Sequence, residues 1–522
     1  MNVLLLNLTR FGDLIQTQPV VAGFVSAGHR VGLLCLDNFA SAGGLLSGVS
    51  WLRVFPGSRL LAALDRDWRE SLRAFEDVRQ DVAQRFAPDV VVNLTPSLSA
   101  RVLARALAGE TGEVRGFGLD AFGFNADSSP WAAFLQTASG NRGASPFNVV
   151  DLFRRAAGLR NEDASFRLAL PDGIGETNGG LLDEAETLLS DLLPEGASLS
   201  GYLGVQLGAS EDRRRWPVQR FAQCAHLFYE RRGLVPVLLG TSSEAALGER
   251  FQQDLERLGR TPVVSLVGKT SLPLLSAVLT RLDLLLTNDT GTMHLAAGLG
   301  TPVAAVFLAT AQPFDTGPYR EDSLCFEPDM DCHPCAFGVP CPRKEECRKV
   351  ITAEAVYGYV AGEDRVPGVR AWRSVRDEDG LMDLESLSDH GCSERARWIA
   401  VQRWHYRRFL DGDAVQPPEW GHGLGAATVT RLRSTLGDVR GLLLLLEQQA
   451  EVLAVRPLPA MKTKFLSGWQ RVQGLLQGDP ALEVLGGLWA FESQIQGDKL
   501  GNLSGLIRRY RGLAEALLNH LT

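Results

Sequence analysis

Residues 287–302, TNDTGTMHLAAGLGTP, place Asp289, Thr290, Gly291 and His294 directly after an apolar run of strand-forming residues. In an open α/β sheet, the turn from a strand into a helix exposes backbone N–H groups at the positive end of the helix. Such a turn is a natural binding site for a diphosphate. The same pattern also describes a plain capped helix with a buried histidine, so the motif alone leaves both interpretations open.

Two further turns in the same region carry residues suited to a nucleotide. In QLGASEDRRRWP, Ser210 follows a strand and precedes Arg213, Arg214 and Arg215, and arginine contacts with phosphate are charge-assisted and often bidentate. In VLLGTSSEAALGERF, Glu244 lies just beyond the next strand, where a carboxylate can accept hydrogen bonds from ribose hydroxyls. Taken singly, the arginines fit a solvated charged run, and Glu244 fits a capping acid in the first turn of a helix. Together, three such turns favour a nucleotide site.

The N-terminal segment NLTRFGDLIQTQP places Asp13 in the loop after the first strand. A carboxylate there is unfavourable for binding phosphate, but it suits a general base that removes a proton from an acceptor hydroxyl. The alternative is that Asp13 caps the helix that follows.

These motifs lie in two regions in which strands alternate with helices, which is typical of doubly wound parallel sheets. The first region covers residues 1–165 and the second residues 166–362. We therefore expect an α/β fold of two lobes, with ligands bound in the cleft between them at the carboxyl ends of the strands. The charged segment 363–389 is predicted to be an exposed linker, and residues 390–522 to form a helical appendage.

Composition limits the class of protein. The chain has 522 residues, 45% of them hydrophobic and 22% charged, with a net charge of −8, which indicates a soluble protein of two or three domains that is not a nucleic-acid binder. The N-terminus lacks a basic leader, and an uninterrupted apolar run of about 18 residues is absent from the sequence. We therefore predict a cytoplasmic location and reduced thiols.

Four of the eight cysteines, Cys332, Cys335, Cys341 and Cys347, gather in the segment 325–347. In a reducing compartment such a cluster predicts a metal site with a structural role, with tetrahedral zinc as the first candidate and an iron–sulfur cluster as the weaker one. The alternative is a cysteine-rich surface loop whose thiols are free or disulfide-linked.

One segment of the appendage, SERARWIAVQRWHYRRFLDG, mixes arginines with Trp398, Trp404, Tyr406 and Phe409. A basic aromatic helix of this kind can lie on an anionic membrane surface. The alternative is a helix packed on its neighbours with the arginines facing outward.

Three of these motifs, RFGDLIQTQP, GASEDRRRWPVQRFA and NDTGTMHLAAGLGTP, resemble in content and order those of glycosyltransferase family 9, the lipopolysaccharide heptosyltransferases. GTSSE and DCHPCAFGVPCPRKEECR fit the resemblance as well, which covers roughly residues 1–362 and leaves residues 363–522 without a counterpart. The resemblance implies a GT-B fold of two Rossmann-like lobes, with the nucleotide-sugar in the C-terminal lobe and the acceptor near the N-terminal lobe. It also implies an inverting single displacement that requires no cofactor.

Carried over by position, the resemblance makes Asp13 the general base. Ser210 and Arg214 would hold the phosphates of the donor, although the family more often has Lys at the position of Arg214, and the two differ in how they meet phosphate. Glu244 would contact the ribose. The diphosphate and the sugar would be bound by Asp289, Thr290, Gly291 and His294.

The resemblance therefore predicts an enzyme that moves heptose or a related sugar from an ADP-sugar to the lipopolysaccharide core or another cell-envelope glycolipid. Its expected location is the cytoplasm, with peripheral contact with the inner membrane. No motif identifies the base of the donor, so two alternatives stay open. One is a GT-B transferase or epimerase that uses a UDP-sugar, and the other is a nucleotide-sugar-binding protein without turnover.

Overall fold

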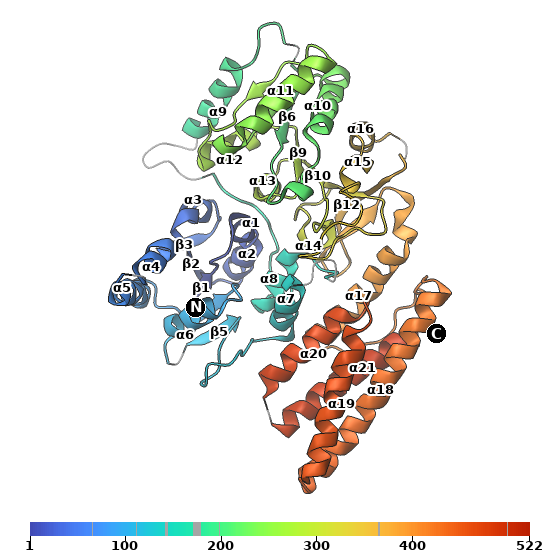
Figure 1. Ribbon diagram of the computed structural model, residues 1–522. Coiled ribbons are helices and arrows are strands. Elements are labelled where there is room, and N and C mark those ends of the chain that lie inside the picture. Colours follow the sequence, from blue (N-terminus) through green and yellow to red (C-terminus); the bar gives the residue numbers. More distant parts are fainter. Residues whose placement is uncertain are drawn as a thin grey trace.

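The computed structural model describes residues 1–64, 66–110, 112–140, 145–170, 179–197, 199–363, 366–497 and 499–522. Figure 1 shows two α/β lobes, the first in blue to cyan and the second in green to yellow, and a bundle of long helices in orange and red. The α/β fold and the C-terminal helical region expected from the sequence are confirmed.

The first lobe is built on a five-stranded sheet in the order β3-β2-β1-β4-β5, in which all neighbours are parallel. Val3 and Leu5 pack into one core while Leu4 and Leu6 pack into another, so helices cover both faces of the sheet and its central strands are continuously apolar. The strands are β1 (Asn2–Leu6), β2 (Arg30–Leu36), β3 (Val49–Phe55), β4 (Val90–Asn93) and β5 (Glu113–Gly116). The helices are α1 (Phe11–Ile15), α2 (Gln18–Ser26), α3 (Ala40–Gly43), α4 (Gly57–Leu64), α5 (Trp68–Arg85), α6 (Leu98–Ala108), α7 (Pro130–Gly140) and α8 (Val149–Ala156).

The second lobe is built on an eight-stranded sheet in the order β13-β12-β11-β10-β9-β6-β7-β8. Its parallel strands are β6 (Gly201–Gln206), β7 (Leu234–Leu239), β8 (Val264–Ser265), β9 (Leu284–Asn288), β10 (Val303–Val306) and β11 (Leu324–Pro328). The helices are α9 (Gly179–Asp191), η2 (Asp212–Arg214), α10 (Val218–Arg232), η3 (Ser242–Glu244), α11 (Ala245–Leu258), α12 (Leu272–Leu279), α13 (Gly291–Gly298), α14 (Pro313–Thr316), α15 (Cys347–Val350) and α16 (Ala353–Ala361).

The prediction that residues 363–389 form an exposed linker is wrong for the described part of that segment. It contains β12 (Val369–Arg376), which pairs antiparallel with β11, and β13 (Met382–Ser386), which pairs antiparallel with β12, so both strands extend the second sheet. Val369, Ala371 and Trp372 are buried, and so is Arg370 between the first two. Charged and apolar residues intermix in these strands because an antiparallel sheet can expose one face to solvent.

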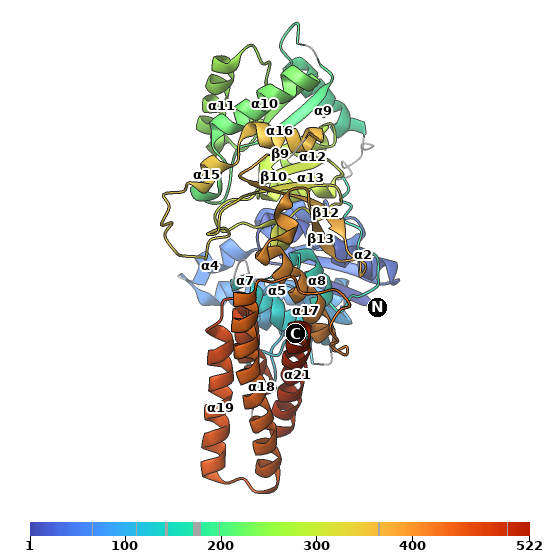
Figure 2. The same ribbon diagram turned by 90° about the vertical axis from the view of Figure 1, so that its right-hand side faces the viewer.

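The helical appendage is an elongated bundle. It comprises η4 (Asp389–Cys392), α17 (Glu394–Asp411), α18 (Ala426–Val455), α19 (Pro459–Gln477), α20 (Glu483–Gln496) and α21 (Leu500–His520). Figure 2 shows α18, α19 and α21 running alongside one another away from the lobes. The buried residues of α18 recur at alternating steps of four and three, which is the spacing of a helix packed in a coiled-coil manner; they are Leu432, Leu436, Val439, Leu443, Leu446, Ala450 and Leu453.

Helix α17, the candidate for membrane contact, is packed inside the molecule. Tyr406 is fully buried, and Arg395, Arg403 and Arg407 of this helix pair with carboxylates of the second sheet and its turns. Arg395 pairs with Glu327, and Arg403 with Asp377 and Asp383. The burial and these ion pairs contradict the prediction that this helix lies on a membrane. They also show that Arg395 and Arg403 face inward, which differs from the alternative of an arginine-rich outer face.

The appendage is anchored to the first lobe as well as to the second. The indole Nε1 of Trp131, on α7, donates to Oδ1 of Asp411 at the end of α17. A Cβ placed on Gly487 of α20 would lie only 2.7 Å from Cγ2 of Thr137, so α20 and α7 pack closely. In the described part of the chain, no helix is both long and apolar enough to cross a bilayer.

Candidate active site

The two lobes meet where α1 of the first faces α13 of the second. Each helix follows the carboxyl end of a parallel strand, β1 or β9, which is where α/β folds bind ligands. A Cβ on Gly12 would lie 3.4 Å from Cδ2 of His294 and 3.5 Å from Cα of Gly291, and a Cβ on Gly291 would overlap the ring of Phe11. Glycine at position 291 is therefore required for this approach, which brings Asp13 beside the first turn of α13.

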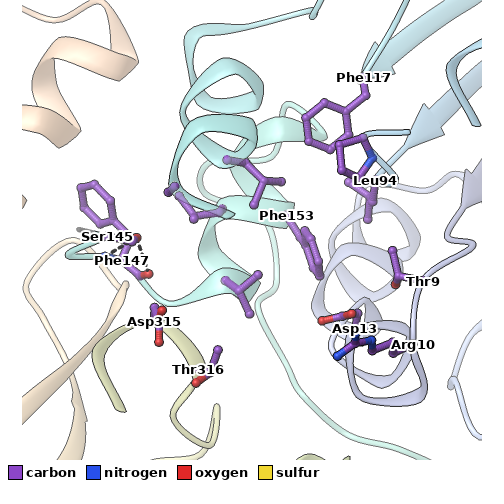
Figure 3. Close-up of a pocket in the computed structure, with 15 residues that line it drawn as sticks. Thr9, Arg10, Asp13, Leu94, Phe117, Ser145, Phe147, Phe153, Asp315 and Thr316 are labelled. Carbon is purple, nitrogen blue, oxygen red and sulfur yellow. Dashed lines mark hydrogen bonds between the residues drawn. The ribbon is translucent and has the colours of Figure 1, made fainter. Parts of the chain in front are cut away.

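Asp13 lines a cavity of about 280 Å³ to which both lobes contribute. In Figure 3, Thr9, Arg10 and Asp13 come from the segment around α1, Phe153 faces them from α8, and Asp315 and Thr316 come from α14 of the second lobe. The N-cap of α1 is Arg10, without a capping hydrogen bond from its side chain, and Asp13 lies within the first turn. Asp13 is therefore not the helix cap that the sequence allowed as an alternative.

The opening motif forms a capped helix whose start faces the first lobe. Thr290 is the N-cap of α13, and its Oγ accepts a hydrogen bond of 3.4 Å from the backbone N–H of Met293. Gly291 is the first residue of the helix, and His294 is buried one turn later. The first turn of α13 thus presents backbone N–H groups and a positive helix end at the lobe interface.

Arg214 connects two of the predicted donor-binding turns. Its Nη1 donates to Oγ of Ser210 at 2.9 Å, and its Nη2 forms an ion pair with Oδ2 of Asp289. Its Nε is buried without a hydrogen-bond partner. The structure therefore brings together Ser210, Arg214 and Asp289, and holds a guanidinium with a spare donor beside the N-terminus of α13.

Asn288 holds the loop that carries these residues, and sequence reasoning missed it. Its Nδ2 donates to the carbonyl oxygens of Leu207 and Gly208 at 3.0 and 2.9 Å, and its Oδ1 accepts from the backbone N–H of Trp216 at 2.9 Å. The signal was present, because a polar amide at the end of an apolar strand must find buried hydrogen-bond partners.

Glu244 completes a capping box at η3, which is the capping interpretation left open by the sequence. Its Oε2 accepts from the backbone N–H of Thr241 at 2.7 Å, and its Oε1 accepts from Nε2 of Gln206 at 3.3 Å. A Cβ on Gly208 would overlap Oε1 of Glu244. The carboxylate thus bridges the turns after β6 and β7 and borders the Ser210 loop, and its contact with a ribose remains a prediction.

Helix α14 joins the donor-side turns to the Asp13 cavity. Oγ1 of Thr316, which lines that cavity, donates to Oδ2 of Asp289 at 3.5 Å. Neither Asp315 nor Thr316 was predicted, although they follow the β10 strand in the order VAAVFLATAQPFDT, and polar residues after a buried parallel strand are candidates for a ligand site.

The buried carboxylate of Glu327 helps to hold α14 in place through Arg395. Glu327 accepts from Nε1 of Trp372 at 2.8 Å and from Arg395 at 3.0 and 3.1 Å, and it pairs with His333 at 3.0 Å. Burial alone would raise the pKa of Glu327, but Arg395 and His333 outweigh it and hold the pKa below its usual range. Because Nη2 of Arg395 also donates to Oε1 of Gln312, the N-cap of α14, the appendage helps to position Asp315 and Thr316.

The predicted cysteine metal site is not supported. Among the residues that the structure describes, no group of three or more His, Cys, Asp or Glu side chains is arranged to hold a metal ion. Cys332, Cys335, Cys341 and Cys347 are free thiols. Burial raises the pKa of Cys335 and Cys347, with a smaller contribution from the neighbouring cysteines. The loop matches the alternative of a cysteine-rich loop with free thiols.

Residues 180–344 match the model of glycosyltransferase family 9 (heptosyltransferase). Lipopolysaccharide heptosyltransferase 1 of Pseudomonas aeruginosa is 25% identical over 344 residues, which cover 64% of this chain and 86% of that protein. Lipooligosaccharide heptosyltransferase 2 of Haemophilus influenzae is 29% identical over 136 residues, which cover 25% of this chain and 38% of that protein. The match thus spans well under half of the length of the Haemophilus relative.

The fold is that of a solved glycosyl transferase family 9 structure from Veillonella parvula. The two superpose with a TM-score of 0.51 at 18% identity, covering 69% of this chain and 96% of the other. The resemblance to the family and the GT-B fold predicted from the sequence are confirmed.

Proposed function

We propose, on the premise that the second lobe carries a glycosyltransferase family 9 domain, that this chain transfers a sugar from a nucleotide-sugar to an acceptor hydroxyl. The observation that carries the proposal is the contact between α1 and α13. It sets a carboxylate, Asp13, beside a helix N-terminus suited to a diphosphate, so that a proton acceptor and a leaving-group site lie next to each other where the two lobes meet.

The second lobe supplies the donor site in this proposal. The backbone N–H groups of Gly291 and the residues after it, together with Ser210 and Arg214, bind the diphosphate. Glu244 accepts hydrogen bonds from the ribose through the lone pairs that its capping box leaves open. Asp289 orients the guanidinium of Arg214, and Thr290 and His294 border the sugar.

Asp13 acts as the general base. Its carboxylate takes the proton of the acceptor hydroxyl as that oxygen attacks the anomeric carbon, and the bond from that carbon to the diphosphate oxygen breaks in the same step with inversion. The negative charge that develops on the diphosphate is stabilised by the N-terminus of α13 and by Arg214.

The donor is ADP-heptose or a related ADP-sugar, and the acceptor is the lipopolysaccharide core or another cell-envelope glycolipid. This choice is supported by the names of the relatives, which are heptosyltransferases of lipopolysaccharide and lipooligosaccharide. A GT-B enzyme that uses a UDP-sugar remains the alternative for the same site, and a binding protein without turnover is the non-enzymatic one.

Calorimetric titration with ADP and with UDP, each with and without magnesium, separates these alternatives. Selective binding of ADP without magnesium is expected, and a preference for UDP would assign the donor to another class. Asp13→Asn should then abolish transfer from ADP-heptose while leaving ADP affinity within about twofold, because general-base catalysis contributes about 10²–10⁴-fold. Near-normal turnover of that variant would remove Asp13 as the base.

Cytoplasmic location with peripheral contact with the inner membrane also remains a proposal. Flotation of the whole chain with anionic vesicles tests the contact with the membrane, and recovery of all protein in the unbound fraction would reject it. Because α17 is buried, a positive result would have to involve another surface.

A further inference from the structure

The cavity beside Asp13 has predominantly apolar walls. Its large side chains come from the ends of β4 and β5 and from the α7–α8 region, and all of them are buried: Leu94, Phe117, Leu135, Phe147, Leu152 and Phe153. Figure 3 shows the ring of Phe153 directed to the same space as Asp13. An acceptor that reaches Asp13 must therefore contact apolar surface and displace water from it.

The ionisable groups at the cavity do not favour an anion. Of the lining side chains that the structure describes, Arg10 is the cation, and Asp13 and Asp315 are carboxylates. Arg10 is exposed, whereas Asp315 is buried. A carboxylate or phosphate on the reacting group would thus meet two carboxylates, whereas the lining cation, Arg10, is exposed and its charge is screened by solvent.

Two arginines that stack on the aromatic walls are neutralised elsewhere. The guanidinium of Arg101 lies 5.1 Å from the ring centre of Phe117 and pairs with the buried Asp127. That of Arg403 lies 5.6 Å from the ring centre of Phe147 and pairs with Asp377 at 2.5 Å. Neither arginine lines the cavity, so both support its rings without offering charge to a ligand.

From these walls and charges we infer that the group carrying the reacting hydroxyl is uncharged and presents an apolar face to the α7–α8 wall. This inference rests on the proposed function, since it takes the Asp13 cavity as the acceptor site. A volume of about 280 Å³ admits a group near the small end of ligand size, such as one ring with a short chain. Any anionic part of the acceptor stays outside, near Arg10.

Calorimetry with three probes, each below its micelle concentration and in the presence of ADP, tests the inference. n-Octyl β-glucoside should bind about tenfold or more tightly than n-octyl β-glucuronide, which differs by one carboxylate, because an unpaired charge is costly to bury. n-Octyl β-glucoside should also bind about tenfold or more tightly than methyl β-glucoside, which lacks the apolar chain. Equal or tighter binding of the glucuronide, or no binding of the octyl glucoside, would overturn the inference.

Val149→Lys and Val149→Asp locate the binding. Val149 lines the cavity, is only partly buried, and is the first residue of α8, where Asp suits the helix N-terminus and should not disturb folding. Lys should reduce the preference for the glucoside over the glucuronide by about fivefold or more, because it attracts the carboxylate of the glucuronide. Asp should weaken octyl glucoside binding by a similar factor, because a charged group replaces apolar contact surface. Unchanged affinities in both variants would place the probe elsewhere and reject the inference.

Leu466→Asp is the matched control, because a second apolar groove, of about 550 Å³, lies in the bundle and includes this exposed leucine. Affinity for octyl glucoside should not change in this variant, and a loss there instead of at Val149 would assign the probe to the bundle and reject the inference. ADP affinity, measured in parallel, separates the two proposals. If ADP binds and the probes behave otherwise than expected, only the acceptor inference fails; if ADP does not bind, the proposed function itself fails.

Discussion

The hydrogen bond of 2.8 Å from Nε1 of Trp131 to Oδ1 of Asp411 joins the first lobe to a helix 280 residues further along the chain. Arg155 and Arg160 approach the same carboxylate at 3.5 Å. Trp131 lies in the first turn of α7, and Leu135, one turn later in the same helix, lines the Asp13 cavity. The appendage is thus part of the framework of the first lobe.

Removing the Asp411 carboxylate should therefore destabilise the protein. Its side chain is 1% exposed, so Asp411→Ala leaves the buried guanidinium of Arg155 without its partner, and breaking a buried pair in this way costs about 3–5 kcal/mol. Urea unfolding followed by tryptophan fluorescence measures the loss. Asp413→Ala is the control, since that side chain is 51% exposed and its loss should cost less than about 0.5 kcal/mol. Equal effects of the two substitutions would contradict this account.

Gly291→Ala should impair transfer far more than folding. The added Cβ would overlap the ring of Phe11 and push α1 away from α13, and a displacement of about 1 Å at a reacting centre can cost 10²-fold in rate. Gly12→Ala is the matched change on the opposite helix. Its Cβ would meet His294 at 3.4 Å, close to ordinary contact, and should cost much less. Steady-state assays with ADP-heptose compare the two, and similar rates would show that the helix contact does not set the reacting geometry.

Arg214→Ala should weaken ADP binding by roughly tenfold or more, because hydrogen bonds to charged groups contribute about 1.5–3 kcal/mol. Arg214→Lys should recover part of the affinity through its charge, but not the bidentate geometry. Arg213→Ala serves as the control, since Arg213 is engaged with Glu211 and with the carbonyl oxygen of Val339. Titration calorimetry measures all three, and an unchanged ADP affinity in Arg214→Ala would remove this residue from the donor site.

The bundle should lose stability in mild acid. Burial, with help from His520 and Arg408, lowers the pKa of His405 from 6.5 to about 3. The carbonyl oxygen of Trp420 accepts from Nε2 of His520, so Nδ1 of His520 is left to accept from Nε2 of His405 at 3.0 Å, an arrangement that requires a neutral His520 ring, while a proton on Nδ1 of His405 would be buried without a hydrogen-bond acceptor. Between about pH 6.5 and pH 3 the unfolded chain binds the proton that the folded chain excludes, and stability therefore falls as pH drops through that window.

The titration of His405 lowers the free energy of unfolding by at most about 1.4 kcal/mol for each pH unit. Urea midpoints at pH 7.0, 6.0 and 5.0 measure it. His405→Gln should flatten the decline, whereas His29→Gln, at a partly exposed position in the first lobe, should not. A decline that is identical in the wild type and in His405→Gln would exclude this histidine as its source.

Local features of the site were predictable from the sequence. Strands and helices alternate in a pattern that local hydrophobicity reveals, and Thr290 and Glu244 form caps with residues three positions away. Such interactions need only the neighbouring chain, so the turns that carry Ser210, Glu244 and Asp289 could be recognised before their arrangement was known. The strands β12 and β13 were missed because their pairing with β11 and with each other is not visible in the local sequence, and their residues are as charged as those of a linker.

By itself, the sequence determined the two α/β lobes, the helical character of the C-terminal region and the identities of the residues at each strand end. Only the tertiary structure decided which of these residues meet. It placed Asp13 against α13, brought Asp315 and Thr316 to the same cavity, lined that cavity with Phe117, Phe147 and Phe153, and buried α17 against the lobes. The physical reason is that strand and cap signals extend over a few residues, whereas these contacts depend on how entire layers pack on one another.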